Sequence, residues 1–442
     1  MEKVSFEQVK KYLIECSGCG KQHLPINELH RGMSYCVACK ENIALCSVND
    51  RYYPKTDMVE FEVQGIWVKE PNPDYIVKSC VSKKQLYTGS YIGDTEEGKK
   101  IAKRKKDGKR AMIEEFTRNN YTVLSDKTYA KKCDVIEWGG KNYLKAGLSK
   151  QLRAEDRLVS NYSFKPTPIF DKTTETIHKS NGIAYLGWEL EVSATDEHDQ
   201  GNETQKLDAA EGLLNWLIDN GLHNKIYFKQ DSSILNGFEI VSHPATYSWW
   251  KQVNMKAFFD KMKELGLREH DTCGLHVHVS RDALTKVQWW ALMVFLSKVP
   301  KKLITLSRRD KDKMRYCRLE NNSNANSMSA SLTGKEVFNV MPPKNLDRAA
   351  AVNFNPEHTV EFRLFKSTMS HEEMYASLST VDALVSFAKE YSFTHIQEAK
   401  SSKLWEDFQN HCVKNGYGSL ISFMEKKELI KLQTKKGKKL CV

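Results

Sequence analysis

Three short segments carry charged or ionisable side chains two residues apart. In a β-strand such residues project from the same face, so each segment would present two functional groups together. The pairs are Glu189 and Glu191 in GWELEV, His276 and His278 in GLHVHVS, and Glu361 and Arg363 in TVEFRLF. Carboxylates and imidazoles bind divalent cations, and an arginine beside a metal-binding acid can neutralise phosphate. The pattern therefore indicates phosphoryl chemistry.

A fourth segment, GFEIVSHP, places the acid Glu239 among apolar strand residues. A buried carboxylate is costly unless it is paired or binds a metal, so Glu239 is a further candidate ligand. Asp231 begins a DSS sequence that is equally typical of a simple Asx turn. Each segment alone is compatible with an ordinary strand face or a local ion pair. Together the four segments predict one sheet face lined with ligands for metal and phosphate.

Four cysteines near the N-terminus follow the spacing C-x2-C-x16-C-x2-C, which is typical of a structural zinc site. They are Cys16, Cys19, Cys36 and Cys39. Each CxxC turn directs two thiolates at one ion, so two turns complete a tetrahedron and leave no position for a substrate. His23 and His30, between the turns, are alternative ligands. We expect a zinc-ribbon-like module that contacts protein or nucleic acid.

The four segments with charged residues resemble, in form and order, the amidoligase family of the glutamine synthetase and gamma-glutamylcysteine ligase superfamily. GWELEV resembles its opening G-x-E-x-E strand, GLHVHVS its glycine-then-HxH string, and TVEFRLF its closing E-x-R strand. GFEIVSHP resembles the string between them. The similarity covers residues 181–370 and is typical of phage and bacterial members. It implies a curved antiparallel sheet with helices on one face.

The resemblance also implies a role for each matching position. Metal ligands would be Glu189, Glu191, Glu239, His276 and Glu361. Nucleotide contacts would be His278, Ser280, Arg308, Arg309 and Arg363, of which Arg308 and Arg309 match the family less closely. The catalytic residues would be Glu189, Glu239, Arg363 and, as a candidate base, Asp231.

The reaction implied by the resemblance consumes ATP with Mg²⁺ or Mn²⁺. A substrate carboxylate takes the γ-phosphate to become an acyl phosphate, and an amine then displaces the phosphate to form an amide. The amine donor would be a small molecule or a protein side chain. The residues alone leave two alternatives open: a two-metal nuclease or phosphoesterase, and a non-catalytic phage interaction protein that binds nucleic acid.

The chain has 442 residues and a formal net charge of +11, concentrated in two basic tracts at 99–110 and 426–439. Both tracts are typical of solvated surface and could also make weak, salt-sensitive contacts with nucleic acid. The N-terminal sequence does not resemble a signal peptide, and the longest apolar run is too short to span a bilayer. We expect a cytoplasmic protein without membrane contact, located in the host cytoplasm if it is of phage origin.

The elements that position these groups follow from hydrophobic periodicity and stop signals. We predict strands at 183–193, 226–228, 238–242, 275–279 and 359–365, and helices at 96–116, 207–220, 249–265, 284–306 and 372–390. The expected fold class is α+β. Three parts are expected: a zinc-binding module at 1–90, a lysine-rich connection at 91–179, and a catalytic domain with C-terminal helices and a basic tail at 180–442.

Overall fold

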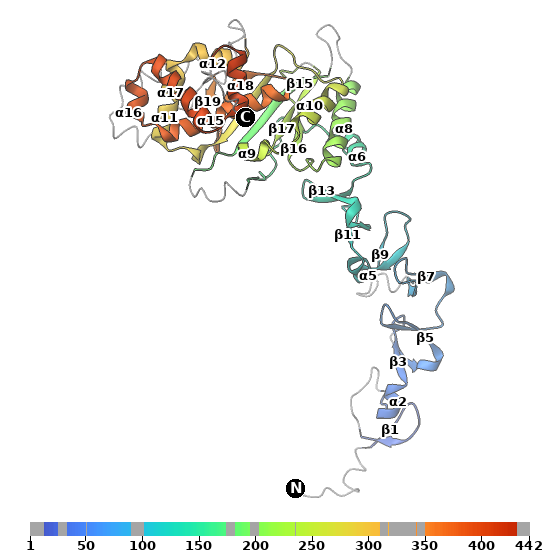
Figure 1. Ribbon diagram of the computed structural model, residues 1–442. Coiled ribbons are helices and arrows are strands. Elements are labelled where there is room, and N and C mark those ends of the chain that lie inside the picture. The colour runs from blue at the N-terminus through green and yellow to red at the C-terminus, as the bar shows by residue number, and fades with distance from the viewer. Residues whose placement is uncertain are drawn as a thin grey trace, which may run out of the picture. The chain divides into compact units, whose positions relative to one another are not determined.

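The computed structural model describes residues 13–24, 33–49, 51–89, 101–173, 182–194, 203–234, 236–309, 317, 342 and 350–430. The chain divides into two compact units, Met1–Leu148 and Ser149–Val442 (Figure 1). The expected connection at 91–179 is shared between these units, and the division into three domains stays a prediction. Among the described residues, no helix combines the length and the apolar character needed to cross a membrane.

Short antiparallel strand pairs and one four-stranded sheet build the first unit. Its helices are α2 (Val37–Glu41) and α5 (Ile113–Arg118), and α6 (Leu148–Ala154) follows at the boundary. Small clusters of buried aromatic and aliphatic side chains form its cores. The strands are β1 (Ile14–Glu15), β2 (Gln22–His23), β3 (Ile43–Cys46), β4 (Arg51–Pro54), β5 (Met58–Phe61), β6 (Ile66–Lys69), β7 (Ile76–Lys78), β8 (Gln85–Tyr87), β9 (Ile101–Lys103), β10 (Arg110–Met112), β11 (Tyr121–Val123), β12 (Tyr129–Lys131), β13 (Val135–Trp138) and β14 (Lys141–Leu144).

The polar helix predicted at 96–116 is wrong for the residues that the structure describes. Strands β9 and β10 form a hairpin there, and α5 begins only at Ile113. The turn of the hairpin contains Gly108, whose φ of +67° is readily adopted by glycine. Asp107 accepts hydrogen bonds from the Arg104 side chain and from the Lys109 backbone. This turn chemistry outweighs the weak helical tendency of the lysines.

A six-stranded antiparallel sheet forms the centre of the second unit (Figure 1). In spatial order its strands are β16 (Ile226–Lys229), β17 (Gly237–Ser242), β15 (Leu186–Ser193), β18 (Gly274–Ser280), β20 (Thr359–Lys366) and β19 (Val352–Asn353). The five predicted strands are all confirmed, although β15 begins three residues later than expected. The curvature of the sheet and its likeness to glutamine synthetase stay predictions.

One face of this sheet is apolar, and the other carries the ionisable residues singled out above. Along β15, the buried side chains of Trp188, Leu190 and Val192 alternate with the two acids. The ring centroid of Trp188 lies 5.5 Å from that of Trp250 and 6.3 Å from that of Phe258. Helices α9 (Tyr247–Trp250) and α10 (Met255–Glu264) therefore cover the apolar face.

The remaining helices of the second unit pack around one long central helix. That helix is α15 (His371–Glu390), which contacts β18 and also α11, α17 and α18. Its Phe387 ring lies 5.1 Å from that of Phe295 and 5.6 Å from that of Phe408. The others are α8 (Glu203–Asp219), α11 (Lys286–Lys298), α12 (Pro300–Ser307), α16 (Phe393–Glu398), α17 (Ser401–Lys414) and α18 (Gly418–Lys426).

Two of the predicted long helices are each interrupted. The helix expected at 284–306 divides into α11 and α12 because Pro300 has no backbone N–H and starts a new helix instead. The helix expected at 249–265 divides into α9 and α10, where the Asn254 side chain accepts a hydrogen bond from the backbone of Ala257 and caps α10.

Candidate active site

Strand register brings the separate sequence segments together. On neighbouring strands Glu191 lies opposite Glu239, Glu189 opposite His276, and His278 opposite Glu361. Residues directly opposite one another in an antiparallel pair have Cβ atoms only about 5 Å apart. Four strands, β17, β15, β18 and β20, therefore place these six side chains on one patch of one face.

The ionisable atoms of this patch lie within reach of shared cations. His276 Nδ1 is 3.6 Å from Glu189 Oε2 and 3.5 Å from Glu361 Oε1, while His276 Nε2 is 3.6 Å from Glu191 Oε1. Two groups of three ligands follow, Glu189–His276–Glu361 and Glu191–Glu239–His276, each with its ligand atoms within 4.8 Å of one another. The predicted convergence of these five residues on one place agrees with this geometry.

Several of these side chains are deeply buried and lack hydrogen bonds. Glu239 is 3% exposed, and its Oε2 accepts no hydrogen bond from the described residues, although the Lys229 ammonium lies 3.6 Å away. His276 is 4% exposed, and its Nδ1 likewise has no hydrogen-bond partner in the part of the chain that is described. A buried polar atom without a partner costs about 1–3 kcal/mol. A bound cation would remove this cost, so the donor set fits a divalent metal.

The carboxyl groups of this patch differ in pKa. Burial, together with the negative charge of Glu189, raises the pKa of Glu239 to about 9, against the opposing effect of the Lys229 ammonium 3.6 Å away. Burial also opposes ionisation of Glu189, but the adjacent His278 and His276 hold its pKa well below the usual range. For Glu361 burial is outweighed in the same way by His278, His276 and Arg363, and its pKa is lowered. Without an added cation, one carboxyl group of the patch therefore holds a proton at neutral pH.

Arg363 lies beside the patch, as the sequence predicts. Its Nη1 donates to Glu361 Oε1 at 2.6 Å, and its Nε has no partner among the described residues. The other oxygen of Glu361 accepts a hydrogen bond of 2.8 Å from Asn353, on β19. Sequence reasoning did not assign this role to Asn353. The only sequence feature that pointed to Asn353 was its position in an NFN sequence shortly before the strand that contains Glu361.

Gly274 and Arg309 lie beside the patch where β18 begins. A Cβ on Gly274 would lie 2.8 Å from Arg309 Nη2 and 3.0 Å from His276 Nε2, so a larger residue would displace the Arg309 side chain. The Gly274 N–H donates to Glu191 Oε2 at 2.5 Å. Arg309 donates to the Phe365 carbonyl at 2.9 Å, and its guanidinium thus reaches the patch.

The other predicted contacts lie farther out. Arg308 donates to Glu373 Oε2 at 2.8 Å and to the backbone carbonyls of residues 366 and 367, so its described contacts connect α12 to the start of α15. The Ser280 hydroxyl donates to the Ile183 carbonyl at 2.9 Å. Asp231 accepts from the Ser233 backbone at 2.7 Å, which is the Asx turn considered above. Roles for these three in nucleotide binding or catalysis stay predictions.

A cavity of about 880 Å³ opens beside the patch and includes Glu189, His278 and Ser280 in its wall. Phe170, Tyr185 and Tyr227 contribute an aromatic side, and the centroids of Phe170 and Tyr185 are 5.0 Å apart at an interplanar angle of 76°. A cavity of this volume can hold a molecule as large as a nucleotide. Sequence patterns did not single out these aromatic residues.

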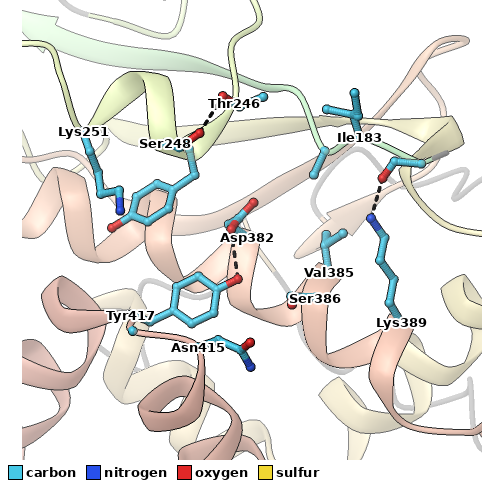
Figure 2. Close-up of a pocket in the computed structure, with 14 residues that line it drawn as sticks. Ile183, Thr246, Ser248, Lys251, Asp382, Val385, Ser386, Lys389, Asn415 and Tyr417 are labelled. Carbon is cyan, nitrogen blue, oxygen red and sulfur yellow. Dashed lines mark hydrogen bonds between the residues drawn. The ribbon is translucent and has the colours of Figure 1, made fainter. Parts of the chain in front are cut away.

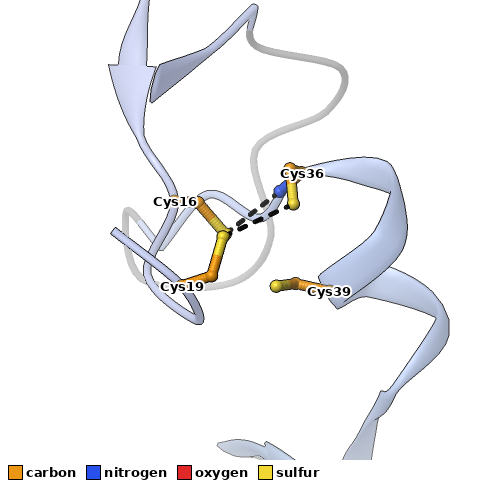
Figure 3. A group of neighbouring side chains, drawn as sticks. All are labelled: Cys16, Cys19, Cys36 and Cys39. Carbon is orange, nitrogen blue, oxygen red and sulfur yellow. Dashed lines mark hydrogen bonds between the residues drawn. The ribbon is translucent and has the colours of Figure 1, made fainter. Parts of the chain in front are cut away.

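The four N-terminal cysteines also converge (Figure 3). Their sulfur atoms all lie within 4.8 Å of one another, and those of Cys19 and Cys36 are 3.8 Å apart. Cys16 Sγ accepts hydrogen bonds from the backbone N–H groups of Gly18 and Cys36. These N–H groups, against the opposing effect of burial, lower the pKa of Cys16 to about 6. The predicted cysteine cluster is confirmed as an arrangement of four thiols.

His23 is not a member of this group of four thiols. Its ring nitrogens face the Leu24 carbonyl at 2.8 Å and the Ser34 hydroxyl at 3.5 Å. His30, the other alternative, lies outside the described residues.

Comparison with solved structures gives only distant overlaps. These are a GmaS/ADP complex, the complex between the prokaryotic ubiquitin-like protein Pup and its ligase PafA, and a bifunctional glutathione synthetase from Pasteurella multocida. Sequence identities are 13%, 10% and 10%, and TM-scores are 0.32, 0.30 and 0.26. The overlaps cover 70%, 56% and 56% of this chain and 79%, 64% and 46% of the others. Overlaps this weak do not establish a common fold.

The sequence itself gives the stronger result. No curated protein matches the chain. A family model described as "Putative amidoligase enzyme" matches residues 95–385. The match spans well over half of the chain and contains every segment that forms the patch on the sheet. The protein therefore belongs to this amidoligase family of enzymes.

Proposed function

We propose that the protein uses ATP and Mg²⁺ or Mn²⁺ to join a carboxylate to an amine through an acyl phosphate. The observation that carries this proposal is the pair of three-ligand groups that share His276, beside the cavity of about 880 Å³. Ligand sets rich in carboxylate oxygens favour Mg²⁺ or Mn²⁺. Membership of the amidoligase family supports amide formation as the reaction.

Different residues of the patch have different proposed roles. When bound, the cations would offset the charge of the transferring phosphoryl group. His278 stands at the junction of patch and cavity, where it would contact the nucleotide phosphates. Arg363 would donate to the phosphoryl group from the side of Glu361. The cation ligands would be Glu189, Glu191, Glu239, His276 and Glu361.

The cavity suits ATP in one orientation. Its aromatic side, with Phe170 and Tyr185, would stack on the nucleobase, while the phosphates would point toward Glu189 and His278. This arrangement leaves the γ-phosphate beside the patch. The substrate carboxylate and the amine would then approach from the side of Glu239 and Tyr227.

The proposed chemistry has two steps. A carboxylate oxygen of the substrate bonds to the γ-phosphorus while the bond from that phosphorus to ADP breaks. The amine nitrogen then bonds to the acyl carbon, inorganic phosphate leaves, and the proton of the amine passes to a base. Asp231 is our candidate for this base, since it follows two residues after Lys229, which pairs with Glu239 in the register of β16 and β17.

An assay that traps the acyl phosphate intermediate tests the proposal. Purified protein with Mg²⁺ and ATP should release ADP when a panel of carboxylates is supplied, and hydroxylamine should convert the acyl phosphate into a hydroxamate. Amines should replace hydroxylamine as acceptors. Cleavage of DNA, RNA or phosphate esters without carboxylate-dependent ADP release would favour the nuclease alternative. Absence of every activity would favour a non-catalytic interaction protein.

We also propose that the four clustered cysteines bind one structural zinc ion. The support is the CxxC spacing together with four sulfur atoms within 4.8 Å and two backbone N–H groups that stabilise the Cys16 thiolate. Gly18 allows the close approach, because a Cβ there would lie 3.1 Å from Cys39 Sγ.

Replacing Cys36 with serine is expected to remove zinc and destabilise the first unit, because metal binding supplies much of the folding free energy of such small modules. Elemental analysis should fall from roughly one zinc per chain to none. ATP binding with Mg²⁺ should persist, since the patch lies in the second unit. Cys133→Ser is the matched control, because Cys133 is an exposed thiol outside the cluster. A folded, zinc-free wild type would contradict the proposal.

Contact with nucleic acid through the basic tracts stays a prediction. In the first tract, Arg104 pairs with Asp107 at 2.5 Å and Lys105 with Asp126 at 2.6 Å. These pairs reduce the positive charge that the hairpin offers to a phosphate backbone. Residues 99–100 and 431–439 of the two tracts lie outside the described residues.

A further inference from the structure

The second unit contains another cavity, of about 590 Å³, which we call the Tyr417 cavity (Figure 2). Helix α9, helix α15, the turn before α18 and the residues leading into β15 form its walls. It has no lining residue in common with the cavity beside the patch. It is therefore a separate site, to which the proposed ligase function assigns no role.

Opposite charges line the Tyr417 cavity. Asp382 projects from α15 into the centre of the view in Figure 2, while Lys251 and Lys389 stand at its two sides. Asp382 Oδ2 accepts a hydrogen bond of 3.0 Å from the Tyr417 hydroxyl. Lys389 donates to the Gly182 carbonyl, and the Lys251 ammonium lies 5.4 Å from the ring centroid of Tyr247. The lining of the cavity thus contains one acidic and two basic side chains.

The Tyr417 hydroxyl holds Asp382 in position. Burial and the negative charge of Asp382 raise the pKa of Tyr417, so the phenol stays protonated and donates its hydrogen bond to the carboxylate. The rings of Tyr417 and Tyr247 stack with centroids 6.2 Å apart and planes 29° apart. Both rings are buried, so close packing restricts their movement.

Apolar side chains line another part of the same cavity. Ile183, Ala184 and Val385 contribute aliphatic surface, and Figure 2 shows Ile183 and Val385 on the side of Lys389. A ligand that suits the whole cavity therefore needs a cationic group, an anionic group and an aliphatic part. These requirements exclude simple inorganic ions and purely apolar molecules.

We propose that the Tyr417 cavity binds an α-amino acid with an aliphatic side chain. Its ammonium group would pair with Asp382, its carboxylate with Lys251, and its side chain would pack against Ile183, Ala184 and Val385. This pocket volume is ample for such a molecule.

Two chain segments connect the Tyr417 cavity with the cavity beside the patch. Residues 182–184 and Thr246 line the Tyr417 cavity, while the adjoining Tyr185 and Pro244 line the other. The two chain segments are joined by hydrogen bonds in both directions between the backbones of Leu186 and Ala245, of 2.7 and 3.0 Å. An amino acid bound at the Tyr417 cavity would thus contact chain segments that continue into the lining of the other cavity.

Calorimetric titration of the full-length protein with three matched probes tests this proposal. L-Leucine carries both charged groups, 4-methylpentanoate lacks the ammonium group, and 3-methylbutylamine lacks the carboxylate. We expect L-leucine to bind and each analogue to bind at least about tenfold more weakly, because each loses one charge-assisted contact. Failure of L-leucine to bind, or equal binding of all three probes, would overturn the proposal.

Matched variants test whether L-leucine binds in the Tyr417 cavity. Asp382→Asn keeps an oxygen that accepts the Tyr417 hydrogen bond but removes the negative charge, so L-leucine affinity should fall by about tenfold or more. Lys251→Met should weaken it similarly. Glu361→Gln, in the proposed ligase site, should leave it unchanged. Loss of affinity in Glu361→Gln but not in Asp382→Asn would place L-leucine in the ligase site and reject an amino-acid site at the Tyr417 cavity.

Discussion

Replacing Arg363 with alanine is expected to lower kcat for ATP-dependent amide formation by about 100-fold, with little change in ATP affinity. The guanidinium lies at 2.6 Å from Glu361, and its Nε has no partner among the described residues. It is thus free to donate to charge that develops as the γ-phosphate transfers. A group used mainly in the transition state affects kcat more than binding.

Arg363→Lys is expected to recover only part of this loss, because an ammonium group lacks the planar fork that contacts two phosphate oxygens. Lys366→Ala is the matched control. Lys366 is a cation on the same strand, but it pairs with Asp271 at 3.3 Å, outside the patch. Steady-state kinetics with a separate ATP-binding measurement checks the prediction. Full turnover in Arg363→Ala would remove this residue from the mechanism, and a fall in stability alone would assign it a structural role.

Divalent cations are expected to stabilise the second unit strongly, and more so as the pH rises. The pKa of Glu239 is raised to about 9 in the folded protein, against 4.5 for an ordinary glutamate. Between these two values Glu239 binds a proton in the metal-free folded state but not in the unfolded state. The contribution of Glu239 to the free energy of unfolding therefore falls as the pH rises from about 4.5 to 9.

A cation bound to the ionised carboxylates reverses this trend, since it replaces the proton. At a concentration 100 times its dissociation constant, Mg²⁺ would add about 2.7 kcal/mol to the free energy of unfolding. Urea unfolding at several pH values, with Mg²⁺ or with EDTA, measures both effects. Glu239→Gln should remove the pH dependence due to Glu239 and weaken the stabilisation by Mg²⁺.

The surface variant Glu264→Gln serves as the control for this experiment. Glu264 is an exposed acid that pairs with Lys261 on the surface of α10, so its loss should change neither effect. If Mg²⁺ stabilises Glu239→Gln as much as the wild type, Glu239 is not a cation ligand.

Much of this site could be predicted from sequence because it lies on strands. A period of two fixes which side chains share a face, so Glu189 with Glu191 and Glu361 with Arg363 follow directly from spacing. Which strands are neighbours is not set by spacing. The family resemblance indicated that these strands belong to one sheet. The register of β15 with β18 then places Glu189 opposite His276.

What sequence reasoning missed depends on contacts between distant segments. Asn353 gains its role only because the two-residue strand β19 pairs with β20 and places it opposite Glu361. Tyr227 lines the cavity because β16 joins the sheet at β17. Local turn chemistry explains the other errors, since the turn at Gly108 and the break at Pro300 outweigh a broadly helical composition.

The order of strands in the six-stranded sheet has a consequence for synthesis on the ribosome. β18 pairs with β15 on one side and with β20 on the other, yet β20 is translated long after both. Until then β18 is an open edge that can pair with other chains, which favours aggregation of the nascent protein. Glu361 and Arg363 arrive on that last strand, so the proposed ATP-dependent reaction would require the completed sheet.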